Sequence, residues 1–192
     1  MTTHTKEKPM NYEVLEQQLA QLPLYSYHFF DPKELDFSQR IRWICQNECP
    51  MYNKSWACPP AVGEVGACKQ KCLRYENCLI IVTMTEVSDI ANLAETLATR
   101  PDHEQITNQV CDLFLEQGVQ PYTLSTEACA VCERCAWLDG QPCRFPERMH
   151  PCVESHGINV IPLFEALEIP FIYGENIVTW VSLLFFDEKC EK

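Results

Sequence analysis

The 192-residue sequence has few positive charges and no long hydrophobic run. Its 15 lysines and arginines stand against 27 aspartates and glutamates, which gives a net charge of −12 at pH 7. This balance argues against a nucleic-acid partner, because binding to phosphate groups requires a basic surface. The longest largely apolar run, 178–186, is interrupted by Thr179 and Ser182 and is far too short to cross a membrane. We therefore expect neither a nucleic-acid nor a membrane partner.

Several common catalytic motifs are also missing from the sequence. It contains no glycine-rich phosphate loop, no dinucleotide-binding fingerprint, no nucleophile elbow and no C-x3-C-x2-C arrangement of radical-SAM enzymes. The first ten residues, MTTHTKEKPM, lack the apolar core of a signal peptide, so we expect a cytoplasmic protein. Thiols are kept reduced in that compartment. The 13 cysteines are then better explained as metal ligands than as a disulfide framework.

Hydrophobic periodicity predicts a single domain, 1–192, of the α/β or α+β class. We expect a mixed sheet with flanking helices and two cysteine-rich metal-binding loops. The predicted parts are an N-terminal helix and strand (1–39), a first cysteine-rich loop (40–78) and a second one (129–156). Helices are predicted at 11–22, 67–75, from 88 or 89 to about 97, from 102 to 118, and at 147–155. Strands are predicted at 24–30, 40–46, 78–84, 121–125, from 158 onward and at 177–186.

The segment CAVCERCAWLDGQPCRFP, residues 129–146, contains the clearest metal-binding pattern. Cys129, Cys132 and Cys135 recur at every third residue, and Cys143 follows as a fourth thiol. Bacterial ferredoxins use the same opening, C-x2-C-x2-C, to hold three corners of a [4Fe–4S] cluster. A structural zinc usually takes two separated C-x2-C pairs, although Cys3His sites exist and His150 is near. The spacing favours an iron–sulfur cluster, with zinc as the alternative.

A second group of thiols lies upstream, in CQNECPMYNKSWACPPAVGEVGACKQKC. Proline follows two of these cysteines directly, which fixes the path of the chain and removes a backbone donor next to the ligand. We expect a second [4Fe–4S] cluster here, with the ligands Cys45, Cys49, Cys58 and Cys68. Cys72 is an alternative to Cys68, because residues at i and i+4 of a helix face the same way.

The remaining four cysteines have less regular surroundings. Cys78 begins a predicted strand and Cys111 lies within a predicted helix, so both are expected to be small core residues. Cys190, in an acidic tail, is expected to be incidental. Cys152, in HPCVESHG, is a possible spare ligand.

Two segments together, CQNECPMYNKSWACPPAVG and CAVCERCAWLDGQPCRFPERMHPCVESHGINV, resemble an uncharacterised family of predicted metal-binding proteins, domain of unknown function 2284. The resemblance extends from Ile41 to the last predicted strand. It implies metal binding, with an iron–sulfur cluster as the expected form, and no established reaction. In that family the position of Cys152 is usually serine, followed by Met-Glu in place of Val153-Glu154, which weighs against Cys152 as a ligand.

These patterns predict a redox protein that passes single electrons from its clusters to a partner protein. Segment 85–127 contains eight acidic residues and one base, Arg100, and is the expected docking surface for that partner. One alternative is an iron–sulfur enzyme with a substrate pocket beside a cluster, in which acid–base groups would come from His150, Glu154 and His156. A zinc-stabilised binding module is the other alternative. The sequence leaves the oligomeric state open.

Overall fold

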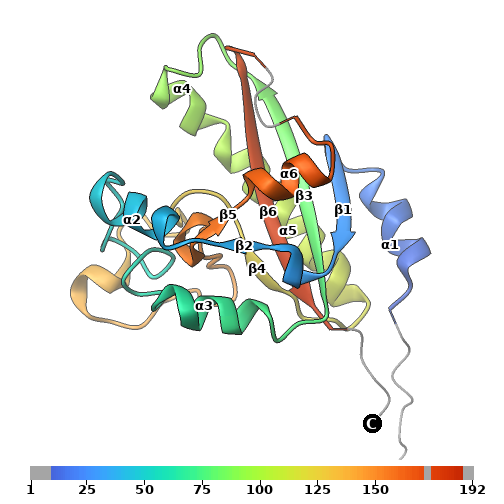
Figure 1. The fold of residues 1–192 in the computed structure, drawn as a ribbon, viewed down its shortest axis with the longest axis horizontal. Helices are drawn as coiled ribbons and strands as arrows, with labels where there is room; N and C mark the ends of the chain where they lie inside the picture. The colour runs from blue at the N-terminus through green and yellow to red at the C-terminus, as the bar shows by residue number, and fades with distance from the viewer. Residues whose placement is uncertain (1–9, 171–173, 188–192) are drawn as a thin grey trace, which may run out of the picture.

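The computed structural model describes residues 10–170 and 174–187 of the chain. A four-stranded sheet lies at its centre, in the spatial order β1-β3-β6-β4 (Figure 1). Its strands are β1 (Ser26–Phe30), β3 (Asn77–Glu86), β4 (Tyr122–Leu124) and β6 (Ile177–Phe186). All pairings within this sheet are antiparallel, and a parallel contact occurs only at an isolated bridge between Ser125 and Cys152 among the described residues. Of the two predicted fold classes, α+β is the one confirmed.

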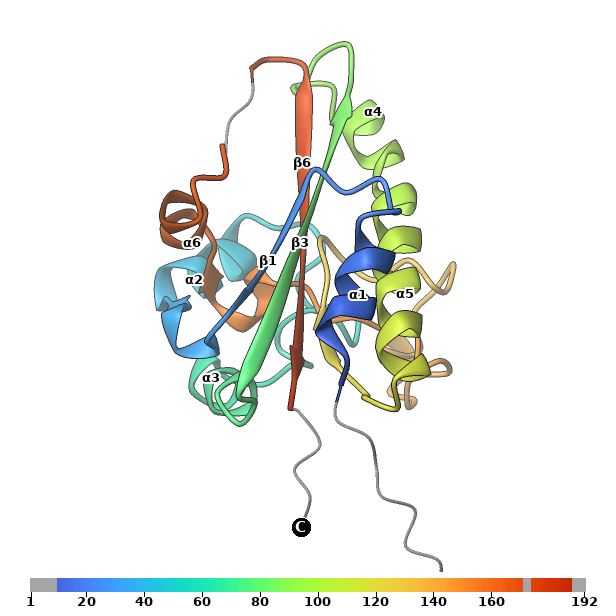
Figure 2. The ribbon, with the colours of Figure 1, turned by 90° about the vertical axis from the view of Figure 1, so that its right-hand side faces the viewer.

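Helices cover both faces of the sheet, as Figure 2 shows with the sheet seen on edge. The helices α1 (Tyr12–Leu19) and α5 (Arg100–Glu116) pack on one face, and α4 (Leu93–Ala98) precedes α5 at the far end. The opposite face is covered by α2 (Gln39–Asn47), α3 (Val65–Cys72) and α6 (Ile161–Ala166). A small second sheet pairs β2 (Asp36–Phe37) with β5 (Ile158–Asn159) on the same side. The short 3-10 helices are η1 (Pro32–Glu34), η2 (Ala136–Asp139) and η3 (Glu154–His156).

The two central strands divide the apolar core between these two layers. Side chains alternate across the sheet, so neighbouring residues of one strand point to opposite faces. In β3, Leu79 and Ile81 face α1 and α5, whereas Ile80 packs with Phe164 of α6 on the other side. Both faces of β3 and β6 are therefore buried, which explains why both strands have nearly continuous apolar sequences.

The predicted strand at 40–46 is wrong, because this segment forms the helix α2. Ser38 caps the helix by accepting a hydrogen bond from the backbone N–H of Arg40 at 3.2 Å. Arg42 is 3% exposed and Cys45 is half-buried, while Trp43 between them is 53% exposed. Trp43 and Cys45 alternate in sequence as in a strand, but they do not share a buried face. Cys45 therefore lies near the C-terminal end of a helix, directly before the rest of the first cysteine-rich loop.

The predicted helix at 147–155 is also wrong. Most of this segment has no regular secondary structure, and only η3, Glu154–His156, is helical at its end. Pro151 explains the difference, since it lies within the segment and lacks the backbone N–H that a helix interior requires. The strand predicted from 158 onward is limited to β5, and α6 follows it. No helix among the described residues has the length and apolar character needed to cross a membrane.

Candidate metal centres

The first cysteine cavity lies between α2, the loop after it and the segment that precedes β5. Its cavity volume is about 30 Å³. Four cysteines line it: Cys45, Cys49, Cys58 and Cys152. Three of these are ligands expected from the sequence, and the fourth is the possible spare ligand. The structure therefore gathers one quartet of thiols from α2, from two turns and from a distant part of the chain.

Cys152 is held in this cavity by backbone hydrogen bonds on two sides. The isolated parallel bridge joins it to Ser125 at the end of β4, where the N–H of Val153 donates to the Ser125 carbonyl at 2.9 Å. Its own N–H donates to the carbonyl of Ala57 at 3.2 Å, next to Cys58. The position of Cys152 is therefore fixed relative to both the central sheet and the first cysteine-rich loop.

The second cysteine cavity is formed by the loop after β4 and has a volume of about 10 Å³. Its wall contains all four cysteines that the spacing predicted: Cys129, Cys132, Cys135 and Cys143. Trp56 of the first cysteine-rich loop also lines it, and the Trp56 Nε1–H donates to the carbonyl of Gln141 at 3.0 Å. The two cysteine-rich loops, far apart in sequence, thus pack against each other.

Cys68 and Cys72 lie on α3 and line neither of these two cavities. The Cys68 thiol donates to the carbonyl of Val62 at 3.4 Å, and Arg42 Nη2 lies 3.8 Å from its sulfur. Cys72 is fully buried in the core between α3 and the sheet. The two thiols lie on the same face of α3, as their i, i+4 spacing predicted, and both are buried. Neither lines the cavity of the first quartet.

Cys78 and Cys111 line neither cysteine cavity. Cys78 is fully buried in β3, and Cys111 on α5 lies 3.2 Å from the hydroxyl of Thr123. Cys190 lies outside the described residues. The twelve cysteines that are described are all free thiols.

The thiols of each quartet surround a cavity without meeting at a point. Among the described residues, no group of three or more His, Cys, Asp or Glu side chains is gathered closely enough to hold a metal ion. Four sulfurs around one zinc ion would lie about 3.8 Å apart, which follows from a Zn–S distance of about 2.3 Å. In the described residues, the thiols therefore line the two cavities without converging on a single metal position.

Burial raises the pKa of four of these eight thiols. It raises the pKa of Cys45 to about 11, and it raises the pKa of Cys58, Cys129 and Cys152 in the same direction. In each case removal from water disfavours the thiolate, which is the form that binds metal. Metal uptake at either cavity must therefore release protons.

Basic side chains lie close to both cavities. Arg42 is buried beside the first quartet and lowers the cost of a negative charge on Cys45, while Arg144 lines the second cavity. Arg134 forms an ion pair with Asp139 at 2.8 Å, so much of its charge is compensated locally. Arg42 and Arg144 are therefore the bases best placed to offset thiolate charge.

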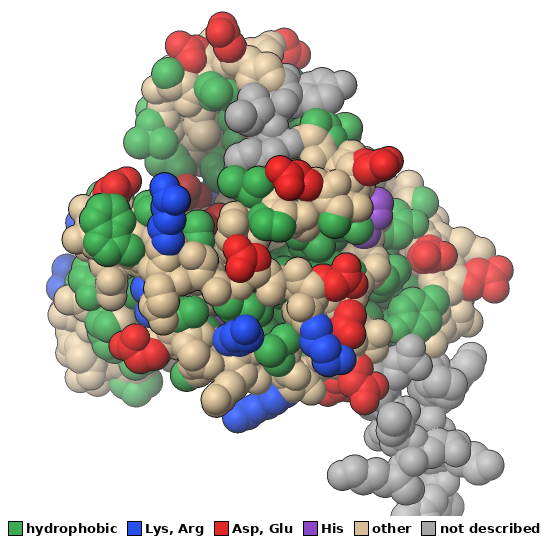
Figure 3. Space-filling view, viewed as in Figure 1, with side chains coloured by type: hydrophobic (Ala, Val, Ile, Leu, Met, Phe, Trp, Pro, Cys, Tyr) green, Lys and Arg blue, Asp and Glu red, His purple; other side chains and the backbone are tan. Residues whose placement is uncertain are grey.

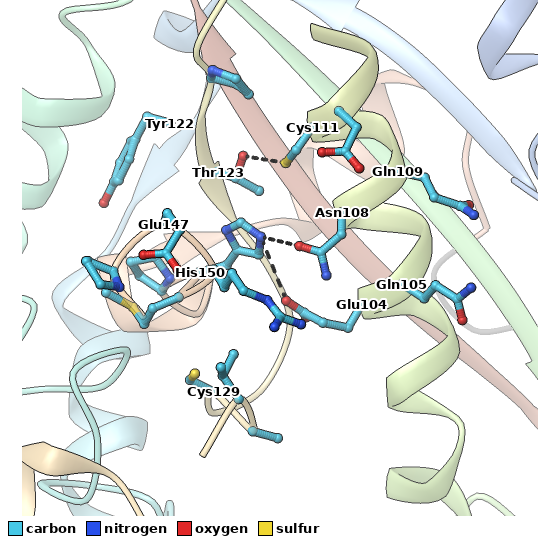
Figure 4. Close-up of a pocket in the computed structure, with 18 of the residues that line it drawn as sticks. Glu104, Gln105, Asn108, Gln109, Cys111, Tyr122, Thr123, Cys129, Glu147 and His150 are labelled. Atoms are coloured by element: carbon cyan, nitrogen blue, oxygen red, sulfur yellow. Dashed lines mark hydrogen bonds and ion pairs between the residues drawn. The ribbon is translucent and has the colours of Figure 1, made fainter. Parts of the chain in front are cut away.

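A wide cleft of about 1050 Å³ opens beside the second cavity, between α5, β4 and the second cysteine-rich loop. Cys129 lines both the cleft and the cavity (Figure 4). In the cleft, His150 Nε2 lies 3.0 Å from Asn108 Oδ1 and 4.0 Å from Glu104 Oε1. Burial lowers the pKa of His150, and the Glu104 carboxylate opposes this effect. The cleft thus combines polar groups with one wall of the second cysteine site.

Of the other two acid–base candidates, neither lines this cleft. The Glu154 Oε2 accepts a hydrogen bond from the Cys152 thiol at 2.7 Å. His156 is 1% exposed, and its Nε2 lies 2.6 Å from the Tyr122 hydroxyl. Both residues therefore have partners within the protein, and His150 alone of the three faces the cleft.

The sequence matches a protein family described as "Predicted metal-binding protein (DUF2284)" over residues 28–186. The chain belongs to this family, and metal binding is the property that its membership supports. A search of curated proteins and a search of solved structures found no similar protein.

Sequence reasoning missed two features of the site. The burial of Arg42 beside the first quartet was not predicted, because it depends on contacts with the distant residues Gly63 and Ser155. The cleft was missed because its walls come from three elements. A signal for Cys152 was present: it is the only cysteine between Cys143 and the last strand.

Proposed function

We propose that the protein is an iron–sulfur protein that holds two [4Fe–4S] clusters, one at each cysteine cavity. The observation that carries the proposal is the grouping of eight free thiols into two quartets, each around one cavity. A [4Fe–4S] cluster takes four cysteine thiolates, so the donor chemistry of each quartet fits. The C-x2-C-x2-C spacing of Cys129, Cys132 and Cys135 is a further argument for a cluster, because bacterial ferredoxins hold their clusters with the same spacing.

The ligands proposed for the second centre are those expected from the spacing, Cys129, Cys132, Cys135 and Cys143. For the first centre we propose Cys45, Cys49 and Cys58 with Cys152, because all four line one cavity. Cys68 remains the competing fourth ligand. It would have to turn away from Val62 and Arg42, its present neighbours, to reach the other three thiols.

When bound, each cluster supplies a centre that takes up and gives up one electron. We propose that the chain transfers single electrons to a partner protein, which is reduced by one electron as the chain is oxidised by one. Glu104 and Asp112 of α5 line the cleft beside Cys129, so a basic electron-carrier protein docked there would come close to the second centre. Figure 3 shows acidic side chains gathered around α4 and basic ones over α2 and α3, so the surface charge is uneven.

Iron and acid-labile sulfide analysis of protein purified without oxygen tests this proposal. We expect a brown protein with iron and sulfide in near-equal amounts, about eight of each per chain. Cys111→Ser is the matched control and should leave both contents unchanged, since Cys111 lines neither cysteine cavity. A colourless protein with zinc and no sulfide would replace the proposal with that of a zinc-stabilised binding module.

A second candidate function is an iron–sulfur enzyme. The observation that favours it is that Cys129 lines the cleft, which would place a bound substrate directly beside the second centre. His150 and Glu104 lie together on the cleft wall and could bind or orient a polar substrate. Turnover of a small molecule with reduced methyl viologen as electron donor, lost in His150→Asn at unchanged iron and sulfide, would favour this function over electron carriage.

A further inference from the structure

Three segments of the chain run from the wall of one cysteine cavity directly into the wall of the other. In the first, Trp56 lines the second cavity and Cys58 lines the first. In the second, Ala128 lines the first cavity and Cys129 lines the second. The third segment passes from Met149 of the second cavity to Cys152 of the first. The two cavities therefore share a wall.

This common wall is thin. Ala128 and Cys129 are consecutive residues, whose Cα atoms are about 3.8 Å apart across a trans peptide. At this point only one peptide unit separates a residue of the first cavity from a cysteine of the second.

The wall is also held in a fixed arrangement by contacts between the two cysteine-rich loops. The rings of Trp56 and Trp137 meet edge to face with their centroids 4.7 Å apart. The Trp137 Nε1–H donates to Asn53 Oδ1 at 2.9 Å, in the direction opposite to the bond from Trp56 to Gln141. The two sites are thus parts of one packed unit, and their separation is set by the fold.

We propose that the two cysteine sites work as one coupled pair, in which a single electron passes through the common wall from one centre to the other. One centre is oxidised by one electron as the other is reduced by it, and no further reactant is involved. The inference rests on the proposed function, because it assumes a redox centre at each site. It adds that a charge on either centre affects the other, since at Ala128–Cys129 a single peptide unit separates the two cavity walls.

Electron paramagnetic resonance during a redox titration of the intact, anaerobically prepared protein tests the coupling. In partly reduced samples, most reduced molecules carry one electron, and we expect a narrow spectrum. In fully reduced samples, both centres carry an unpaired spin, and we expect the spectrum to broaden and split. The wild-type protein alone provides this comparison, so the test does not depend on any variant folding.

Two variants provide a second readout. Cys132→Ala removes a thiol of the second cavity and Cys49→Ala removes one of the first. In each variant we expect a narrow spectrum at full reduction and a higher midpoint potential for the remaining centre, because a nearby negative charge has been removed. The control Cys111→Ser should retain the broad spectrum.

The result that would overturn the inference is a fully reduced wild-type spectrum equal to the sum of the two single-site spectra, with unchanged midpoint potentials. If iron and sulfide were both near eight per chain in that sample, the proposed function would stand and only the coupling would fail. A preparation without sulfide would overturn the proposed function, and the coupling with it.

Discussion

Cys68 and Cys152 are both almost completely buried thiols, with 2% and 9% of their surface exposed, but they differ in what surrounds them. Cys152 shares its cavity with three other cysteines. The Cys68 thiol instead donates a hydrogen bond to a backbone carbonyl and lies next to the guanidinium of Arg42. The family resemblance weighed against Cys152 as a metal ligand, whereas its position in the first cysteine cavity favours it as one. The choice between the two residues is therefore a question that single substitutions can decide.

We predict that Cys152→Ala lowers the iron content by about half, from about eight to about four per chain, because only one of the two centres loses a ligand. Cys68→Ala, the matched control, should retain the full content. Iron and sulfide analysis of both proteins, with circular dichroism to verify folding, measures the effect. Loss of iron in Cys68→Ala with full content in Cys152→Ala would contradict the assignment.

His103 gives a residue-scale prediction that does not depend on metal. It lies between the sheet and α5, where Nδ1 is 2.8 Å from the Thr83 hydroxyl and Nε2 is 2.9 Å from the Ser182 hydroxyl. Burial lowers its pKa from 6.5 to about 4. Between these two values the unfolded chain binds a proton that the folded protein does not, so stability falls as the pH falls from 6.5 towards 4.

We predict that this single histidine contributes up to about 3 kcal/mol to the loss of stability over that pH range. His103→Gln keeps a polar side chain but removes the titrating group. Urea unfolding of both proteins at several pH values between 7 and 4 isolates the contribution, because all other groups are shared. Equal pH dependence in the two proteins would show that His103 does not titrate as described.

At the scale of elements, α2 connects the first cysteine site to the rest of the fold through Arg42. Its Nη1 donates to the carbonyl of Gly63 at 2.7 Å, and its Nη2 donates to that of Ser155 at 2.5 Å. One side chain therefore joins α2 to the loop before α3 and to η3, which follows Cys152. The helix, and Cys45 with it, is positioned by these contacts.

Replacing this arginine should destabilise the protein strongly. Hydrogen bonds from a charged donor contribute about 1.5–3 kcal/mol each, so we predict a loss of about 3 kcal/mol or more for Arg42→Met. Arg40→Met on the same helix is the control, because Arg40 is exposed, and its effect should stay within about 0.5 kcal/mol. Denaturant unfolding measures both, and similar losses in the two variants would contradict the role given to Arg42.

The same element shows where sequence reasoning fails. In segment 40–46, the alternation of apolar residues resembles a strand, and the helix is favoured instead by the cap at Ser38 and by the burial of Arg42. A buried arginine cannot be recognised from local sequence, because its partners lie far along the chain. By contrast, β3 and β6 were predictable, since both faces of these strands are apolar.

At the scale of the molecule, the second quartet was predictable and the first was predictable only in part. Cys129, Cys132 and Cys135 follow one another within a single loop, so their spacing alone brings them together. The first quartet needs Cys152, which reaches the cavity only through its bridge to Ser125 and its bond to Ala57. Contacts of this kind depend on tertiary packing, which spacing does not encode.

Native mass spectrometry of the oxygen-free protein tests the central claim most directly. For the wild-type chain we predict a mass above that of the metal-free chain by two [4Fe–4S] units, and for Cys132→Ala by one unit. These masses would show two separate centres and the loss of one of them with a single thiol. A wild-type mass that exceeds the metal-free chain only by zinc ions, with no inorganic sulfur, would contradict the account.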